Sequence, residues 1–261
     1  MPRNNLVHMA TYKKRGYKPK DKVEKIEEHS ATAEVFKSLD EGASKTEDWV
    51  AANQKYIFVI VGLVAVAVLG YLGYNKFVAE PARQEAMNDM FKAQSYFNDA
   101  VNAPVKDKDS LFNLALQGAG GKFGLLNVIE EHSGTPAANL ANYYAGMAFL
   151  NTKKYKEAIE YLSDYSAEDE VTGVIAKGAI GDAFMQLNQP KDALGYYKQA
   201  ATMRDNEFTT PMYLFKAGTT ALQLGEASKA LDYFNKIKLE YPKSTQATDV
   251  EVYIGKAEAL K

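Results

Sequence analysis

The chain has 261 residues, of which 46% are hydrophobic and 25% are charged, and its formal net charge is −2. This balance is ordinary for one globular domain with an added membrane anchor. Cysteine is absent, which excludes disulfides, thiolate nucleophiles and cysteine-rich metal sites.

The N-terminal segment, residues 1–55, holds 11 Lys or Arg against 9 Asp or Glu, and its basic residues are concentrated before Asp21. We predict that this tail is largely disordered, above all residues 1–22, which contain few apolar residues. Met9 is an alternative start. The basic residues are interpreted as a solvated, topology-setting tail, in preference to a surface for nucleic acid or anionic lipid.

Two features of the tail predict helix. Apolar residues between Val23 and Leu39 are spaced as in a weak amphipathic helix that meets a membrane or a partner, although a partly helical linker fits equally well. Ser44 and Glu47 form a capping box, which predicts that a helix begins there and runs into the apolar segment that follows.

Residues 54–77 read QKYIFVIVGLVAVAVLGYLGYNKF, with no charge from Tyr56 to Asn75. Twenty residues of helix are about 30 Å long, which matches the hydrocarbon core of a bilayer. A cleaved signal peptide is disfavoured because the run begins too far from the N-terminus. A buried core helix would show a polar stripe, but no polar side chain interrupts the run between Tyr56 and Tyr71. We therefore predict an uncleaved transmembrane helix over 56–77.

The orientation of this span follows from the tail. A short segment with 11 basic residues is expected to stay in the cytoplasm, while a long domain after the span can be translocated largely regardless of its charge. The prediction is a single-pass membrane protein with the N-terminus in the cytoplasm and residues 78–261 on the opposite side of the membrane.

The remainder of the chain is predicted to be all-α, because its apolar residues follow helical spacing and Pro or Gly residues separate the segments. The predicted helices are 82–101, 122–132, 136–150, 154–166, 172–187, 190–204, 210–224, 227–240 and 245–260.

Three segments of this region align with one another without gaps: NLANYYAGMAFLNTKKYKEAIEYLSDY, VIAKGAIGDAFMQLNQPKDALGYYKQA and PMYLFKAGTTALQLGEASKALDYFNKI. Their starts at 139, 174 and 211 are separated by 35 and 37 residues. Small residues recur where the paired helices should approach each other: Gly146, Gly181 and Gly218 in the first helix, and Ala158, Ala193 and Ala230 in the second.

These segments resemble the tetratricopeptide repeat family, whose period is about 34 residues. The resemblance implies an α-solenoid of helical hairpins, with repeats at 139–172, 174–207 and 211–244 and a capping helix at 245–260. It also implies a protein-binding scaffold, since solenoids of this kind bind partners on a concave surface. The family's usual Trp is absent, and its terminal Pro occurs only as Pro242.

The same resemblance implies a groove lined by the first helix of each repeat. The positions carried over are Leu140, Tyr143, Met147, Leu150, Ile175, Gly178, Asp182, Met185, Met212, Phe215, Thr219 and Leu222. Most are apolar, and Met suits adaptable contacts. The alternative, that these side chains belong to the core, stays open. The charged clamp by which some relatives hold a chaperone's C-terminus is not expected, because Tyr143 and Met147 stand where Lys and Asn are needed.

No catalytic site is predicted. His8, His29 and His132 lack partners at helical spacing, and GAGGKFG at 118–124 lacks the Ser or Thr and the first Gly of a phosphate-binding loop. That segment is interpreted as a flexible link. No metal or other cofactor is expected, and the protein is interpreted as a non-enzyme.

The order of parts resembles the YfgM-like family, an ancillary subunit of the bacterial Sec translocon. The residues that carry this resemblance are PARQEAMNDMFKAQSYFNDA after the span and GTPAANLANYYAGMAFLNTKKYKEAIEYL in the first repeat. The resemblance implies a protein of the bacterial inner membrane. It also implies that residues 78–261 form a periplasmic, chaperone-like domain that receives emerging polypeptides near translocon subunits and a membrane-bound foldase. A structural adaptor of an envelope complex is the alternative.

Overall fold

The computed structural model describes residues 31–167 and 171–261, and the chain forms two compact units, Met1–Leu72 and Gly73–Lys261. The predictions that concern Met9, His8, His29 and the first part of the amphipathic segment lie outside the described residues, as does the end of the first repeat at 168–170.

The first unit is built on one long helix, α1 (Ala31–Tyr74), which is helical through Ser44 without interruption. The prediction that a helix begins at Ser44 is therefore wrong. Residues 31–55 form part of one helix, where a weak amphipathic helix ending at Leu39 and a separate helix from Ser44 were predicted within a largely disordered tail. The physical reason is that a capping box starts a helix only where the preceding residues do not propagate one. The run from Ala31 to Leu39 consists mostly of good helix formers.

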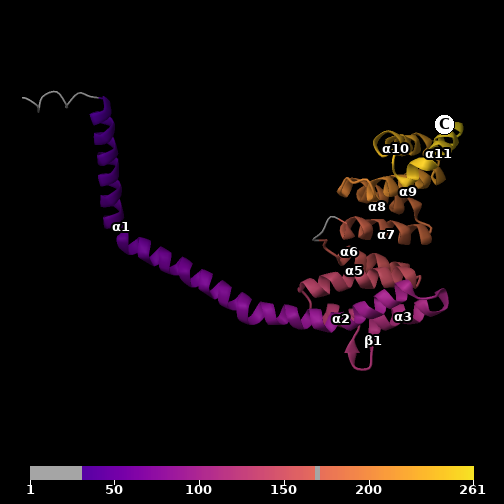
Figure 1. Cartoon of the computed structure of the whole chain (residues 1–261), viewed down its shortest axis with the longest axis horizontal. Helices are drawn as coiled ribbons and strands as arrows, with labels where there is room; N and C mark the ends of the chain where they lie inside the picture. Colours follow the sequence, from indigo (N-terminus) through magenta and orange to yellow (C-terminus); the bar gives the residue numbers. More distant parts are fainter. Residues whose placement is uncertain (1–30, 168–170) are drawn as a thin grey trace, which may run out of the picture. The chain divides into compact units, whose positions relative to one another are not determined.

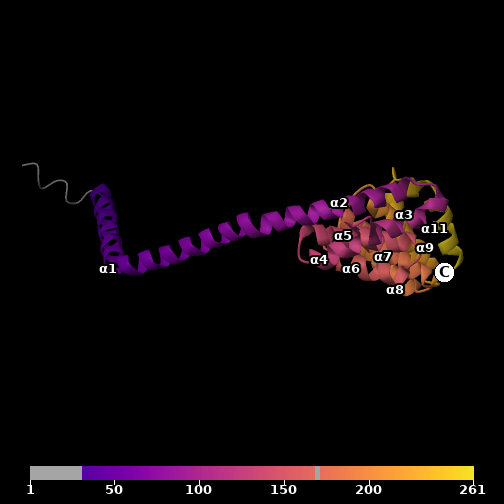
Figure 2. The same cartoon turned by 90° about the horizontal axis from the view of Figure 1, so that it is seen from below.

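Helix α1 bends in its N-terminal half, as Figures 1 and 2 both show. Polar side chains there donate hydrogen bonds to carbonyls of their own helix: Ser38 Oγ to Val35 O at 2.9 Å and Thr46 Oγ1 to Gly42 O at 2.7 Å. Such bonds compete with the backbone ladder and commonly bend helices.

The apolar part of this helix is long enough, by length and composition, to cross a membrane, and 0% of its most apolar window is buried. The alternative of a core helix predicts burial of that window, so the structure disfavours it. Exposed apolar side chains here include Phe58, Leu63 and Leu69, each 65–68% exposed.

The chain continues as helix past Pro81, because a π-helical turn, η1 (Asn75–Ala79), precedes α2 (Glu80–Asn102). The Glu80 N–H donates to the carbonyl of Asn75, five residues back. Proline lacks a donor and its ring presses on the carbonyl four residues earlier. The wider π turn accommodates both effects without ending the helix.

The second unit begins with elements that the sequence patterns predict incompletely. They are α2, α3 (Val105–Gln117), β1 (Gly118–Ala119), β2 (Lys122–Phe123) and α4 (Leu125–Glu131). Helix α3 was missed because its charged first turns, VKDKDS, hide the apolar residues that follow. Phe112, Ala115 and Leu116 are nevertheless buried against α2 and α5.

The glycine-rich segment is a β-hairpin, which corrects its interpretation as a flexible link. Ala119 pairs with Lys122 across a turn in which Gly120 has φ 60° and Gly121 has φ 73°. Positive φ at both central residues is typical of a tight two-residue hairpin turn and favours glycine at each.

The repeats form successive antiparallel hairpins. Their helices are α5 (Pro136–Asn151), α6 (Tyr155–Asp164), α7 (Thr172–Gln186), α8 (Pro190–Met203), α9 (Thr209–Gln223) and α10 (Ala227–Glu240). Each helix contacts the next along the chain, and the stack is visible in Figure 1. The end predicted as one capping helix comprises a 3₁₀ turn, η2 (Thr245–Thr248), and α11 (Val250–Ala259).

In each hairpin the two helices meet where a glycine faces a large side chain. The pairs are Gly146 with Leu162, Gly181 with Tyr197, and Gly218 with Phe234. A Cβ on these glycines would lie 2.4, 2.6 and 2.5 Å from the facing side chain. Ala158, Ala193 and Ala230, the recurring small residues of the second helices, are each 0% exposed.

The turn inside each hairpin has the same backbone form. Lys153, Asn188 and Gly225 occupy equivalent positions with φ of 61°, 56° and 75°. The next N–H donates to a carbonyl five residues back, as Lys154 does to Phe149 O at 2.9 Å. This is the Schellman ending of a helix, in which a left-handed residue satisfies the last carbonyls.

Lys153→Gly should therefore stabilise the repeat unit by about 0.5–1 kcal/mol, because glycine relieves the left-handed strain of a lysine but loses more entropy on folding. Chemical denaturation of the full chain in detergent measures the change. Gly225→Ala is the matched control and should destabilise by about 1 kcal/mol, since alanine would have to adopt the positive φ. A destabilised Lys153→Gly variant would contradict this account of the turn.

Candidate protein-binding surface

The nine apolar residues predicted to line a groove lie on the first helix of each hairpin, and we call them the first-helix surface. They are Leu140, Tyr143, Met147 and Leu150 on α5, Ile175 and Met185 on α7, and Met212, Phe215 and Leu222 on α9. All nine are half-buried. Among the polar or small positions carried over with them, Asp182 and Thr219 are half-buried and Gly178 is buried.

The three helices that carry this surface are neighbours, since α5 contacts α7 and α7 contacts α9. Tyr143, Met147 and Leu150 of α5 pack against a cluster that includes Ile180 of α7. The hydroxyl of Thr220 on α9 points to the sulfur of Met185 on α7, at 3.8 Å. The surface is therefore continuous from one repeat to the next.

Several of these side chains also serve the core. The ring of Phe215 meets Tyr253 edge-on at 4.7 Å and Phe234 at 5.9 Å between ring centroids. The ring of Tyr143 lies 5.2 Å from that of Tyr165. Phe215 and Tyr143 are thus half-buried residues with one part fixed by packing and another part open to solvent, which suits a pre-organised contact surface.

An aromatic stack supports the centre of this surface. A Cβ on Gly178 of α7 would lie 1.9 Å from Cε1 of Tyr213 on α9, so only glycine leaves room for that ring. Tyr213 in turn stacks on Tyr197 of α8, with ring centroids 6.5 Å apart and planes 19° apart. Both tyrosines are 3% exposed. The stack joins the second and third repeats.

One ion pair lies beside the stack. Lys216 Nζ of α9 is 2.7 Å from Asp182 Oδ1 and 2.8 Å from Oδ2, and the Tyr197 hydroxyl donates to the same Oδ1 at 2.7 Å. The Lys216 and Asp182 side chains are 35% and 37% exposed. An ammonium group has three donors, so one N–H of Lys216 is left to meet a carbonyl or carboxylate of a bound chain.

Asp182 was predicted from the sequence to lie on this surface, whereas Lys216 was missed. The two residues are 34 positions apart and each lies in a first helix, but in the repeat alignment Asp182 corresponds to Thr219 and not to Lys216. The pair depends on how α7 packs against α9, so the aligned repeat positions did not reveal it.

The stacked tyrosines also set how the protein responds to alkali. Burial first, and then the charge of Asp182, raise the pKa of Tyr197 and of Tyr213 well above the ordinary value of 10.0. An unfolded tyrosine loses its proton near pH 10, while these two retain theirs in the fold. The folded state then binds more protons than the unfolded state, so stability is intact below about pH 10 and is lost as pH rises further.

We therefore expect the free energy of unfolding to fall by up to about 1.4 kcal/mol per pH unit for each such tyrosine above pH 10. Urea unfolding at pH 9 and pH 11 measures this slope. Tyr197→Phe, which keeps the ring and removes the titrating hydroxyl, should reduce the slope. An equal slope in the variant would show that Tyr197 does not keep its proton in the fold.

His132 has a side-chain partner that the sequence analysis did not find. His132 Nε2 lies 2.8 Å from Asp89 Oδ2, 43 residues away in sequence, so the contact is invisible to helical spacing. Within residues 31–167 and 171–261 no group of three or more His, Asp or Glu side chains is arranged to hold a metal ion. This pair therefore links α2 to the end of α4.

Comparison with known proteins identifies the repeats. The tetratricopeptide repeat family matches residues 125–170 and 179–245. The chain therefore contains tetratricopeptide repeats, and the prediction of an all-α solenoid of helical hairpins is confirmed. The match begins at Leu125, the first residue of α4, and so includes one helix before the first aligned repeat. Repeats of this kind form protein-binding scaffolds.

One similar solved structure is a kinesin light chain from Podosopora anserina with nearly identical TPR-like repeats. It has 12% identity and a TM-score of 0.47 over 68% of this chain and 87% of that one. No curated protein matched the sequence.

Proposed function

We propose that this protein is a membrane-anchored protein-binding module, a chaperone-like ancillary subunit of the Sec translocon that receives secreted polypeptides in the periplasm. The observation that carries the proposal is the joining, in one chain, of an unburied apolar helix and a continuous first-helix surface on tetratricopeptide repeats. The YfgM-like order of parts supports the translocon as the location.

The first-helix surface suits clients of varied sequence. It offers Met147, Met185 and Met212, whose flexible thioethers adapt to different apolar side chains. Lys216 adds one donor that can bind a backbone carbonyl, a group that every polypeptide presents. A surface of adaptable apolar contacts with one main-chain anchor favours extended polypeptides over a single folded epitope.

The anchor sets where that surface acts. The apolar part of α1 is exposed, as a helix in lipid must be, and the basic tail before it favours a cytoplasmic N-terminus. With this orientation the repeats lie in the periplasm beside the membrane, where secreted chains emerge. The partners are then translocon subunits, a membrane-bound foldase and the emerging chains.

Topology is the first test. Protease added to cells with a permeabilised outer membrane should digest residues 82–261 and spare the N-terminal tail. Because the span separates the two parts, their susceptibility should reverse when protease is given only to inverted inner-membrane vesicles. Digestion of the tail alone in permeabilised cells would overturn the periplasmic assignment.

Client binding is the second test. The chain has no cysteine, so Met147→Cys and Met185→Cys each introduce one attachment point for a photo-crosslinker. We expect adducts with many secreted chains in cells, and few from Lys198→Cys, an exposed position on the second helix of the same repeat as Met185.

The same experiment separates the adaptor alternative. A single stoichiometric adduct from both methionine positions would support an adaptor and contradict the chaperone-like role. Adducts at Lys198→Cys equal to those at Met147→Cys would contradict any use of the first-helix surface.

A further inference from the structure

The β-hairpin and helix α2 enclose a hollow, which we call the hairpin hollow. Its volume is about 350 Å³, and it is lined by Asn88, Asp89, Phe91 and Lys92 of α2 and by Gly121, Lys122 and Phe123 of the hairpin. Figure 1 shows the hairpin projecting from the side of α2 and α3, away from α7 to α10. The first-helix surface lies on α5, α7 and α9, so the hairpin hollow is built from other elements.

Close approaches of the backbone at its base hold the hairpin in one shape. A Cβ on Gly118 would lie 2.1 Å from Lys122 O, and a Cβ on Gly124 would lie 2.3 Å from Gly118 N. Only glycine leaves room at either position. The backbone at Lys122 and Phe123, between these glycines, is consequently fixed beside α2, which strand β2 contacts.

His132 connects the two walls of the hairpin hollow. Its ring lies 6.1 Å from the ring of Phe123 between centroids, and its Nε2 is 2.8 Å from Asp89 Oδ2. The His132 side chain is only 12% exposed, so it is held in place by its surroundings. Because the hairpin wall and the α2 wall are joined in this way, the hollow is pre-organised for a ligand.

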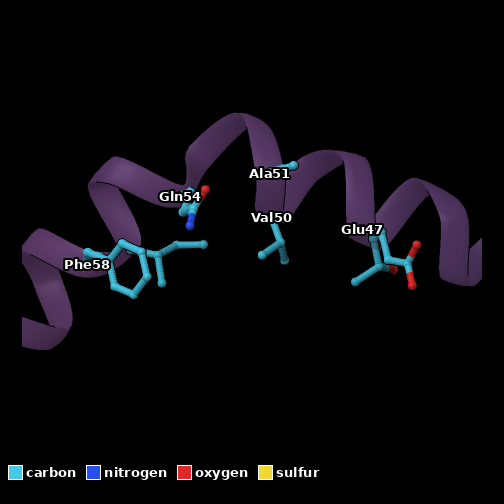
Figure 3. Close-up of a pocket in the computed structure, with 7 residues that line it drawn as sticks. Glu47, Val50, Ala51, Gln54 and Phe58 are labelled. Carbon is cyan, nitrogen blue, oxygen red and sulfur yellow. The ribbon is translucent and has the colours of Figure 1, made fainter.

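Another hollow, of about 500 Å³, differs in having a single wall. All of its lining residues belong to α1, and Figure 3 shows Glu47, Val50 and Phe58 projecting to the same side of that helix. Only the bend of one helix maintains its shape. The hairpin hollow, in contrast, is maintained by two elements and by the contacts of His132.

The hairpin hollow combines an exposed aromatic ring with positive charge. Phe91 is 71% exposed, although it is large and apolar. Lys92 and Lys122 are exposed, and within the described residues neither takes part in an ion pair. Asp89, the carboxylate in the lining, directs its Oδ2 to His132. An apolar side chain flanked by carboxylates is the ligand that complements this lining.

The place of the hollow along the chain favours a protein segment over a lipid headgroup as its ligand. The helix continues from η1 through α2, and Lys92 follows Asn75 by 17 residues, which is about 25 Å of helix. The headgroup layer adds only about 5–8 Å on each side of the hydrocarbon core. Because Asn75 ends the uncharged run, the headgroups lie well short of Lys92 along this helix.

We propose that the hairpin hollow binds an acidic segment of a partner protein, which inserts one apolar side chain against Phe91 and directs its carboxylates to Lys92 and Lys122. Since the first-helix surface lies on other helices, the chain can hold this partner and a second protein at the same time. Binding at the hairpin hollow does not depend on what the first-helix surface binds.

Two peptides test this site with the full chain in nonionic detergent. The probe is fluorescein-labelled GDELEDG, in which a leucine is flanked by carboxylates, and its uncharged twin is GNQLQNG with the same label. Fluorescence anisotropy should show at least about tenfold tighter binding of the acidic peptide, because the two ammonium groups attract it. The difference should shrink as salt is added, since both lysines are exposed to solvent.

Charge reversal separates the hairpin hollow from charge elsewhere on the chain. Lys92→Glu combined with Lys122→Glu should lower the affinity for the acidic peptide at least about tenfold. Lys106→Glu combined with Lys191→Glu is the matched control, because it changes the net charge equally at two exposed lysines outside the hollow. The control should bind as the natural chain does.

The apolar contact has its own pair of variants. Phe91→Ala should lower the affinity for the acidic peptide about fivefold, because the leucine loses the ring that it covers. Phe208→Ala removes a ring that is 75% exposed and lies outside the hollow, so it should leave the affinity unchanged. Every substituted side chain is exposed, and unchanged circular dichroism spectra would exclude loss of folding.

Equal affinity for the two peptides, absence of binding by both, or equal losses in the two double variants would overturn the proposal. Lipid is tested with a dye on Asn88→Cys, because the natural chain has no cysteine. The labelled chain is placed in nanodiscs that contain spin-labelled lipid headgroups, and we expect no quenching. Quenching of the dye would place the hollow at the headgroups and would overturn its assignment to a protein segment.

Discussion

Phe234→Ala should lower the free energy of unfolding of the repeat unit by about 3–5 kcal/mol, the range for removing a buried aromatic ring. Phe234 is 0% exposed and lies where three elements meet. Its ring fills the space above Gly218, and it contacts the rings of Phe215 at 5.9 Å and Tyr253 at 5.5 Å. Because these neighbours are rings or backbone, they cannot collapse far into the cavity.

Denaturant unfolding of the full chain in detergent, followed by circular dichroism, measures this loss. Phe208→Ala is the matched control, since that phenylalanine is 75% exposed and its removal should change stability by less than about 0.5 kcal/mol. Similar losses for the two variants would show that the third hairpin is not packed around Phe234. We also expect Phe234→Ala to loosen Phe215, and so to weaken binding at the first-helix surface.

Gly178→Ala should destabilise the same unit by about 1–3 kcal/mol, although alanine is the better helix former by about 1 kcal/mol. The added Cβ would lie 1.9 Å from Cε1 of Tyr213 and 2.1 Å from its Cζ. Tyr213 is 3% exposed and stacked on Tyr197, so its ring can move only by disturbing that stack. The cost of overpacking therefore exceeds the gain in helix propensity.

Gly195→Ala provides the control, because Gly195 lies in helix α8 and a Cβ added to it would meet nothing within 4 Å. Gly195→Ala should therefore raise the free energy of unfolding of the repeat unit by about 0.5–1 kcal/mol. The opposite signs of the two variants are the prediction. Two stabilised variants would mean that the stack yields freely, and Gly178 would then have no role in joining the second and third repeats.

The sequence alone was sufficient to predict the three helical repeats. Gly146, Gly181 and Gly218 recur at nearly constant spacing because each lets a second helix approach. This requirement restricts the residue type at one position, so it can be recognised in the sequence. The uncharged run from Tyr56 to Asn75 likewise predicted an unburied helix from its composition. The hairpin at Gly120 and Gly121 was misread, since glycine signals both flexible links and tight turns.

The features that were predicted wrongly or left open depend on structure beyond their immediate sequence neighbours. Local capping residues at Ser44 did not start a helix, because a helix already propagated from Ala31. Asp182 was placed on a surface, but its ion pair with Lys216 requires α7 and α9 to lie side by side.

The sequence by itself determined the architecture of this protein: one long apolar helix followed by tetratricopeptide hairpins. Those features follow from periodicity, composition and the small residues at helix crossings, which act over one or two turns. Only the tertiary structure decided that the groove residues are half-buried, that Gly178 admits Tyr213, and that Lys216 meets Asp182. Each of these depends on the stacking of one repeat on the next, which brings together residues about 34 positions apart.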